Sequence, residues 1–589
     1  MAVLPQLTSV NAYDYGLIAL YFGIVIWVGF YSAKKNQRTE DYFKAGGQVP
    51  WFMAGVSNWV SGFSAFMFVA AAGYTYKHGS GALILFTSAF WAYLAGAWYF
   101  GPAWRRVRIT APLEFLTKRY SPSTTYFYTV TAILPQILGI AQGLYILCIF
   151  VSAALGLDRE VFHLLGFELT GLQLCMLSVG VVMILYSVVG GLWAAVLSDA
   201  VQGVIILVMS LLIFPISLTF VGNGGGLLAG IERVFSDLPR EYLIPSGQPV
   251  NPAFMSAYIV SVFLGYNVAW HLVQRYNSVA SERDARKMAF LCAWLSLVGP
   301  LLWVLPVMAA KLIFPDMAVL WPNLQAPEEA SFVSLAMLLL PHGMIGFVVA
   351  AILSATLGQA NDAFNWLAAA TTKDVYVPLR RRCGFGEASD HHQLRVAQFT
   401  MLVVGVAGVA MSFVISKLGG AFDFGLKYYS MVGPAFMMPV LLGLVYRKTP
   451  WWSGIASCTA AFTLSIGLFV LDVWPEHAYP RNVFSAVIAS TVVFVVSAFW
   501  YRADDPKSAK AIQLDRDLRK PVPDGPVPVG GLRDYAMLAW VSALLGAVLL
   551  CCWFLPARPP ASATVNAVAG VLLFVIAGLL WRVSKPRAG

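Results

Sequence analysis

Long apolar runs separated by short polar segments make up almost the whole chain. A membrane-spanning helix needs roughly 20 mostly apolar residues, and about fifteen runs reach that length. These runs are residues 13–33, 51–76, 80–103, 123–155, 170–190, 191–221, 252–275, 287–314, 342–373, 392–418, 422–446, 450–472, 482–502, 535–556 and 564–583. The pattern predicts an all-α polytopic membrane protein. We expect its first span to be retained, because the N-terminus lacks the basic region and the cleavage site of a signal peptide.

The polar segments between the spans alternate in charge. Basic residues occur in every second segment, namely 34–49, 104–122, 276–286, 374–391, 447–449 and 503–534. The segments between them, such as 157–169 and 315–341, are neutral or acidic. Membrane proteins keep an excess of Lys and Arg on the cytoplasmic side. We therefore expect a multi-pass protein of the plasma (inner) membrane, with its N-terminus outside and its C-terminus in the cytoplasm.

The longest polar segment, 503–534, divides the chain into two parts. It is charged and contains several prolines between residues 521 and 528. Such a composition predicts a flexible cytoplasmic linker. The linker would separate a transmembrane core, residues 13–502, from two additional spans within residues 535–583.

Composition supports lipid as the solvent. Hydrophobic residues make up 59% of the 589 positions and charged residues 12%, whereas soluble domains are about one quarter charged. The net charge of +10 comes from short clusters between apolar runs, which is the membrane pattern rather than that of a nucleic-acid-binding surface. The seven cysteines show no metal spacing and no disulfide framework, and we expect no organic cofactor.

Acidic residues inside two spans are candidates for function. The stretch "ILSATLGQANDAFN", residues 352–365, contains Gln359, Asn361 and Asp362 without a basic residue beside them. A second carboxylate, Asp199, lies in "GGLWAAVLSDAVQGVIIL". A charged residue within a span costs about 2.5–3.5 kcal/mol or more, so it usually faces a partner or a cavity. Either an interhelical hydrogen-bond network or the lining of an ion or solute path explains these residues.

Two further spans combine glycines with polar residues. Their polar positions and glycines are Ser57, Ser61, Gly62 and Ser64 in the first, and Gly265, Tyr266, Asn267 and His271 in the second. The pattern fits the discontinuous helices of secondary transporters, whose unwound backbone contacts solutes at the midplane. Small residues also mediate tight helix packing, which is the alternative. Other candidates to line the same cavity are Gln136 and Gln142, with Phe66, Met67, Tyr266 and Trp270 as apolar walls or gates.

At these residues the chain resembles the sodium:solute symporter family, which includes sugar, proline, sialic acid and vitamin transporters. The resemblance covers about residues 13–502. It is carried by motifs that occur in the family's order, namely "TEDYFKAGGQVPWFMAGVS", "GGLWAAVLSDAVQ", "QRYNSVASERDARK" and "SATLGQANDAFNWLAAATTKDVY". It implies a LeuT-like fold with two inverted five-helix repeats, here about residues 51–221 and 252–446. It also implies a secondary active transporter that imports a small organic solute by alternating access, coupled to Na⁺.

Carried over by position, the resemblance implies two groups of site residues. The ion-binding group comprises backbone carbonyls of Val60, Phe63 and Ala355, the two hydroxyl positions, here Gly358 and Gln359, and the nearby carboxylate Asp199. The substrate-binding group comprises Ser64, Met67, Gln136, Gln142, Tyr266, Asn267, His271, Asn361 and Asp362.

The expected ion site departs from the family pattern. Gly358 and Gln359 replace two hydroxyl residues, Asn361 replaces a carboxylate, and Asp362 replaces a serine. Hard cations bind through several oxygen ligands, and glycine supplies no side-chain oxygen. Three possibilities remain open: weakened Na⁺ binding, proton coupling through Asp199 or Asp362, and uncoupled transport.

The solute is expected to be small and neutral or zwitterionic. The seventh span lacks the polar pattern of sugar-binding members, since residues 262–265 read Val-Phe-Leu-Gly. The middle of the fourth span lacks an arginine that would bind a sialic acid carboxylate. Two other function classes are the alternatives. A membrane solute sensor would keep the fold without transport, and an enzyme is not expected because G-x-S-x-G, H-E-x-x-H, P-loop and C-x-x-C motifs are missing from the sequence.

Overall fold

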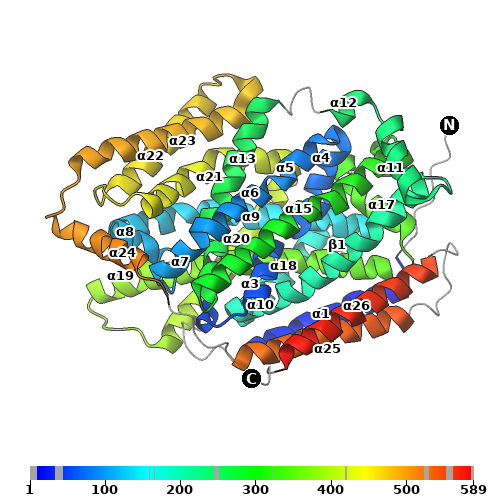
Figure 1. The fold of residues 1–589 in the computed structure, drawn as a ribbon, viewed down its shortest axis with the longest axis horizontal. Helices are drawn as coiled ribbons and strands as arrows, with labels where there is room; N and C mark the ends of the chain where they lie inside the picture. Colours follow the sequence, from blue (N-terminus) through cyan, green and yellow to red (C-terminus); the bar gives the residue numbers. More distant parts are fainter. Residues whose placement is uncertain are drawn as a thin grey trace.

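Helices form nearly all of the structure, a computed structural model (Figure 1). It describes residues 10–33, 44–157, 160–164, 166–244, 251–322, 324, 326–341, 343–417, 421–522, 529–551 and 562–585. Two short antiparallel strands, β1 (Val161–Leu164) and β2 (Phe167–Thr170), pair Val161 with Thr170. The predicted all-α membrane architecture is confirmed, with this small hairpin between two long helices as an addition.

The first half of the chain contains one long helix after another, with short helices at the bends. Its helices are α1 (Ala12–Ala33), η1 (Ala45–Gly47), α3 (Trp51–Phe68), α4 (Ala70–His78), α5 (Gly81–Thr87), α6 (Ala89–Ala95), η2 (Gly96–Phe100), α7 (Gly101–Val107), α8 (Glu114–Arg119), α9 (Pro122–Ala154), α10 (Gly171–Val221), α11 (Gly226–Asp237) and α12 (Arg240–Leu243). The two spans that were expected to meet at residues 190 and 191 are continuous in α10.

The second half continues in the same way. Its helices are α13 (Pro252–Val268), α14 (Trp270–Ser278), α15 (Glu282–Ile313), α16 (Met317–Leu320), η3 (Pro327–Ala330), α17 (Ser331–Leu339), α18 (Met344–Ala370), η4 (Thr371–Tyr376), α19 (Val377–Arg382), α20 (Asp390–Ile415), α21 (Ala421–Val445), α22 (Ser453–Val470), η5 (Pro475–His477), α23 (Ala478–Ser497), η6 (Ala498–Trp500), η7 (Pro506–Ser508), α24 (Ala509–Arg519), α25 (Val529–Cys551) and α26 (Ser562–Ser584).

Many of these helices can cross a membrane. Among the described residues, ten helices are long and apolar enough, and the number rises to twelve if each of two bent helix pairs counts as one span. Two shorter apolar helices, Gly171–Leu185 and Tyr429–Val445, accompany them. The multi-pass architecture is therefore confirmed, whereas the number fifteen stays a prediction.

Both glycine-containing polar spans are bent. The first changes direction by 49° between Trp51–Gly62 and Phe66–His78, and the second by 41° between α13 and α14. At the second bend Ala269 leaves the helical region, with φ −64° and ψ 130°. The backbone of α14 thus restarts at Trp270, in the middle of the molecule, as a discontinuous helix requires.

The helix α1 is tied to the beginning of α18 by a buried carboxylate. Oδ1 of Asp14 accepts hydrogen bonds from the backbone N–H groups of Gly343 and Gly346, each at 2.8 Å. A carboxylate at a helix N-terminus satisfies free N–H groups and favours the helix dipole. At Gly346 an added Cβ would lie 2.3 Å from the backbone oxygen of Asp14. The close approach of α1 to α18 therefore requires glycine at this position.

The segment expected to be a loose linker contains a packed helix. The helix α24 lies against α7 and α8 (Figure 1), and Leu514 and Leu518 are buried there. Asp515 forms an ion pair with Arg447, and Nη1 of Arg106 donates to the backbone oxygen of Leu518 at 3.1 Å. The expectation of flexibility is therefore wrong for residues 509–519. Ala511, Leu514 and Leu518 lie on one face of α24 and are buried against the core.

The last two helices form a hairpin at one edge of the molecule. The helices α25 and α26 pack along each other and contact α10, on the side where α1 also lies (Figure 1). The rings of Phe52 and Tyr535 lie 6.4 Å apart, which places the start of α25 beside α3. The two additional spans thus pack on the core rather than apart from it.

Candidate functional site

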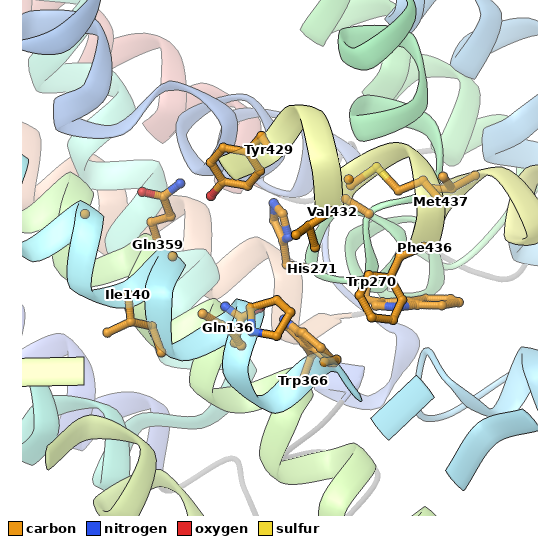
Figure 2. Close-up of a pocket in the computed structure, with 18 of the residues that line it drawn as sticks. Gln136, Ile140, Trp270, His271, Gln359, Trp366, Tyr429, Val432, Phe436 and Met437 are labelled. Atoms are coloured by element: carbon orange, nitrogen blue, oxygen red, sulfur yellow. The ribbon is translucent and has the colours of Figure 1, made fainter. Parts of the chain in front are cut away.

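Two adjoining cavities lie where the bent helices meet α9, α18 and α21. Their volumes are about 180 Å³ and about 290 Å³. Residues that line both include His271, Gln359, Tyr429 and Thr356, with Gly139 and Gly143 on α9. In Figure 2 the side chains of Gln359, Tyr429 and His271 point toward the same space. We call this shared layer the middle of the site.

The two cavities extend from the middle in opposite directions along α9. The first cavity reaches Ala132 of α9 and Trp366 of α18, and the second reaches Ile146 of α9 and Tyr258 of α13. At 1.5 Å per residue, Ala132 and Ile146 are roughly 21 Å apart along the helix. The cavities together therefore cover much of the thickness of a bilayer core, about 30 Å.

The first cavity is aromatic, with a few polar groups. Trp270, Trp366 and Phe436 line it, and Gln136 adds an amide (Figure 2). Ligand pockets are typically apolar surfaces with a small number of placed polar groups. The polar groups that line it are amides, the His271 imidazole and the hydroxyls of Tyr429 and Thr356, which include both donor and acceptor types.

One hydrogen bond joins the two bent helices beside the second cavity. The hydroxyl of Tyr266, on α13, donates to the backbone oxygen of Gly62, on α3, at 3.2 Å. An added Cβ at Gly62 would lie 2.7 Å from Cε1 of Tyr266. The tyrosine ring therefore fits only against a glycine, and it links the bend of α3 to the bend between α13 and α14.

An ionic cluster lies next to the cavities. Nη2 of Arg275, on α14, lies 3.2 Å from Oδ2 of Asp199, on α10, and also pairs with Asp362, on α18. All three side chains are fully buried. Two serines of α3 complete it: Ser57 donates to Oδ2 of Asp199 at 2.6 Å and Ser61 donates to Oδ2 of Asp362 at 2.7 Å. We call these five residues the aspartate–arginine cluster.

The arginine uses its other donors within the same cluster. Nε of Arg275 donates to Oγ of Ser57 at 3.2 Å, and Nη1 donates to the backbone oxygen of His271 at 2.9 Å. Burying a charge is costly unless it is paired and hydrogen-bonded. Each carboxylate keeps a second oxygen, Oδ1, that is buried and has no hydrogen-bond partner among the described residues.

The structure places the expected site residues in several different surroundings. The cavities bring together Gln136, Gln142, Tyr266, His271 and Gln359, and Asp199, Asp362 and Gly358 meet at the aspartate–arginine cluster. Val60 is a buried α3 residue that faces α10, where an added Cβ at Gly203 would lie 3.2 Å from it. The side chains of Phe63, Ser64 and Ala355 lie outside the described part.

Three expected substrate residues do not line the two cavities. Met67 lines a third, smaller cavity of about 80 Å³ with Phe86 and Trp303, which adjoins the second cavity at Gly62 and Tyr266. Nδ2 of Asn267 donates to the backbone oxygens of Ala92 at 3.1 Å and Phe263 at 2.9 Å, which ties α13 to α6. Asn361 is buried, and neither polar atom of its side chain has a hydrogen-bond partner among the described residues.

Four residues of the site were not predicted from the sequence, namely Arg275, Tyr429, Trp366 and Phe436. Arg275 is the last residue of the expected span 252–275 and stands directly before the basic segment 276–286. A signal did exist, because two carboxylates within spans need a cationic partner. The aromatic residues carry no local signal, since most aromatic residues of a membrane helix face lipid or neighbouring helices.

The expected ion site offers few side-chain ligands for Na⁺. Gly358 has no side chain, and an added Cβ would lie 2.4 Å from Oδ1 of Asp199. The Gln359 side chain lines the cavities instead. Arg275 already pairs with Asp199 and Asp362. The backbone carbonyls of residues 60, 63 and 355 stay a prediction as ligands, without the two hydroxyl groups of the family pattern.

Comparison with known proteins supports the resemblance. The model of the sodium:solute symporter family matches residues 42–451, more than half of the chain. A sodium/glucose cotransporter from Vibrio parahaemolyticus is 26% identical over 479 residues, which cover 77% of this chain and 84% of that protein. The sodium/sialic acid symporter NanT from Aliivibrio fischeri is 23% identical over 515 residues, which cover 83% of this chain and 93% of that protein. The sodium/myo-inositol cotransporter 2 from Sus scrofa is 25% identical over 551 residues, which cover 85% of this chain and 78% of that protein.

A solved structure shows the same fold. It is a substrate-bound, outward-open state of a Na⁺-coupled sialic acid symporter, with a TM-score of 0.69 and 18% identity, covering 84% of this chain and 98% of that chain. The LeuT-like architecture, the bent helices and the cavities between them agree with transport rather than with catalysis. The chain belongs to the sodium:solute symporter family, as a multi-pass secondary transporter with a LeuT-like fold.

Proposed function

We propose that this transporter imports a small, neutral, polar organic solute that binds in the middle of the site. The observation that carries the proposal is the charge of the cavity walls. The described residues that line the two cavities include no Asp, Glu, Lys or Arg. An ionised solute group would be buried there without a partner of opposite charge, which is costly. Zwitterionic and anionic solutes are therefore disfavoured relative to neutral ones.

The polar groups present suit hydroxyl or amide groups of a solute. His271, Gln359 and Tyr429 converge on the middle (Figure 2), and Gln136 and Gln142 extend the polar surface into the two cavities. Trp270, Trp366 and Phe436 supply flat apolar surfaces for the less polar face of a ring. The relatives are named for glucose, sialic acid and myo-inositol, so these three compounds are the first solutes to test.

Alternating access follows from the arrangement of the cavities around one middle layer. Opening one cavity while the other closes would expose the solute to one side of the membrane at a time. For orientation, we propose that the N-terminus is outside and the C-terminus cytoplasmic, in the plasma (inner) membrane. We also propose a core of residues 13–502, with inverted repeats at about 51–221 and 252–446. A cytoplasmic segment, 503–534, would connect this core to the two helices within 535–583.

The coupling ion to test first is Na⁺, because the family description names it. The backbone carbonyls of Val60, Phe63 and Ala355 are proposed as its oxygen ligands by position, near Asp199. No organic cofactor is part of the proposal.

The first experiment is solute counterflow in proteoliposomes, which needs no ion gradient. We expect exchange of labelled glucose or myo-inositol and no exchange of sialic acid. Gln359→Ala should raise the half-saturation concentration about fivefold, since a lost hydrogen bond is worth about 1 kcal/mol.

Asn267→Ala is the matched control, because it removes a buried amide that lies outside the cavities. It should lower thermal stability and leave the half-saturation concentration unchanged. Exchange of sialic acid alone would contradict the proposal, and so would equal effects of the two substitutions on solute affinity.

A further inference from the structure

We propose that the segment containing α24 is a strap that must release before the first cavity opens on the cytoplasmic side. We call residues 509–522 the α24 strap. The proposal rests on the proposed function, because it uses alternating access and the cytoplasmic position of residues 503–534. Three observations carry it, namely the helices that the strap joins, their position around the first cavity, and the kinds of contact that hold the strap.

One end of the strap is attached to α7 and α15. Nη1 of Arg106, near the end of α7, donates to the backbone oxygen of Leu518 at 3.1 Å. Nη2 of the same arginine donates to Oε2 of Glu282, the first residue of α15, at 2.7 Å. Oε1 of Glu282 in turn accepts from the backbone N–H of Val522 at 2.6 Å. The strap, α7 and α15 are thus joined by a continuous set of hydrogen bonds.

The helix α7 is also attached to the bent pair α13 and α14. Arg105 donates from Nε to the backbone oxygen of Val279 at 2.9 Å and from Nη2 to that of Ala280 at 3.1 Å, directly after α14. Nε1 of Trp104 donates to the backbone oxygen of Asn267 at 2.8 Å, close to the bend. A displacement of α14 would therefore act on α7 and, through Arg106, on the strap.

The strap is attached to α8 and α21 as well. Asp515 forms an ion pair with Arg447, two residues after the end of α21. The helix α24 also packs on α8, and Arg119 of α8 donates to the backbone oxygens of Gly443 at 3.1 Å and Tyr446 at 3.2 Å. The strap therefore connects two groups of helices, with α7, α14 and α15 in one and α8 and α21 in the other.

Helices from both groups form the walls of the first cavity. Trp270 of α14 and Val440 of α21 line it. Val440 precedes Arg447 by seven residues, roughly 10 Å at helical rise. Ala132 of α9 lines the same cavity, and α9 begins at Pro122, directly after α8. Separating the two groups at this end would widen the cavity toward the strap, and a docked strap opposes that separation.

The contacts of the strap are of kinds that can break and form again. The helix α24 has 11 residues, and isolated helices shorter than about 12–15 residues are marginal in water. Its helical form therefore depends on docking. Asp515 and Arg447 are partly exposed, so water can replace their pairing at small cost. Elements that move during function come from the less stable parts of a protein, and the α24 strap has these properties.

The first test fixes the strap to the core. Arg447→Cys/Asp515→Cys is bridged by a short bis-methanethiosulfonate reagent in proteoliposomes, after the native cysteines at positions 383, 551 and 552 are replaced by serine. Counterflow of labelled glucose or myo-inositol is then measured. We expect exchange to fall at least tenfold on bridging, because the first cavity cannot open, and to recover when dithiothreitol reduces the bridge.

A second ion pair supplies the matched control for the bridge. Arg381→Cys/Glu387→Cys receives the same reagent in the same background, since Arg381 and Glu387 form an exposed ion pair within residues 374–391. This bridge lies within one short segment and joins no two of the helix groups. It should leave exchange unchanged.

The second test needs no solute. Ala132→Cys places a reporter thiol in the first cavity, and Leu514→Ala/Leu518→Ala loosens the strap without changing a residue that lines the cavity. In inverted vesicles we expect a membrane-impermeant maleimide to react with the reporter at least threefold faster in the loosened protein. Leu464→Ala, which shortens an exposed leucine of α22, is the control and should leave the rate unchanged.

Two results would overturn the proposal. One is full exchange by protein whose bridge between positions 447 and 515 is complete by mass spectrometry. The other is an equal maleimide rate with and without the loosened strap. If Leu514→Ala/Leu518→Ala does not fold, Asp515→Asn carries the labelling test. A lack of exchange before bridging would count against the proposed solute class, while the maleimide rates still decide the role of the strap.

Discussion

At the scale of single residues, the site depends on glycines as much as on charged groups. Gly62 makes room for the Tyr266 ring, and Gly358 makes room for the Asp199 carboxylate. Neither glycine contacts a solute through a side chain, yet each decides which neighbouring side chain can lie beside the helix. The chemistry of the site is therefore set partly by positions that carry no functional group.

A substitution at Gly358 tests this directly. Gly358→Ala should destabilise the protein by about 1–3 kcal/mol, as overpacking of a buried site does, because its Cβ would lie 2.4 Å from Oδ1 of Asp199. Gly467→Ala, in α22, is the control, since an added Cβ there meets nothing within 4 Å. Thermal unfolding in lipid nanodiscs measures both. Equal melting temperatures would mean that Asp199 can move away from α18 at little cost.

At the scale of elements, a helix in this protein is stabilised where its hydrophobic residues pack against an apolar surface of the core. The helix α24 is the clearest case, because five of its 11 residues are charged and prolines follow it. Composition alone therefore predicted a linker. Ala511, Leu514 and Leu518 recur at intervals of three and four residues, which places them on one helix face, and all three are buried.

The contribution of this apolar face can be compared with that of its ion pair. Leu514→Ala should cost about 2–5 kcal/mol of stability, as large-to-small substitutions in packed sites do. Asp515→Asn breaks the partly exposed pair with Arg447 and should cost about 1 kcal/mol or less. Limited proteolysis between α23 and α25 reports on the docking of α24. Faster cleavage of Asp515→Asn than of Leu514→Ala would show that charge rather than apolar packing holds the helix.

The sequence predicts some elements of the site well and others poorly. The bent helices were predictable, because glycines and polar residues at a span's centre are local signals. The aspartate–arginine cluster was not, since residues 199, 275 and 362 come together only through the packing of three helices. Asn267 shows the reverse error: its position in a bent span suggested the cavity, but its amide binds backbone oxygens of α6 and α13.

At the scale of the whole molecule, the arrangement of helices predicts two faces with different accessibility. The proposed orientation, which rests on the basic segments between spans, would place residues 374–391 on the cytoplasmic side and the connection between α25 and α26 outside. The chain carries native reporters for both, because Cys383 and Cys551 are free and exposed.

Labelling with a membrane-impermeant maleimide tests this orientation. In intact cells the reagent should react with Cys551, at the end of α25. Cys383 should react only in inverted vesicles or after permeabilisation. The variant Cys383→Ser should lose the labelling seen in inverted vesicles and keep the labelling seen in intact cells. Reaction of Cys383 in intact cells would reverse the orientation, and the charge pattern would then need another explanation.

The burial of the aspartate–arginine cluster has an electrical consequence. One guanidinium lies between two carboxylates there, so the cluster has a net charge of −1 when both carboxylates are ionised. A membrane potential does about 2.3 kcal/mol of work per elementary charge and 100 mV. A movement of these helices along the membrane normal moves this charge as well. Voltage then acts on the helices themselves, even when the transported solute is neutral.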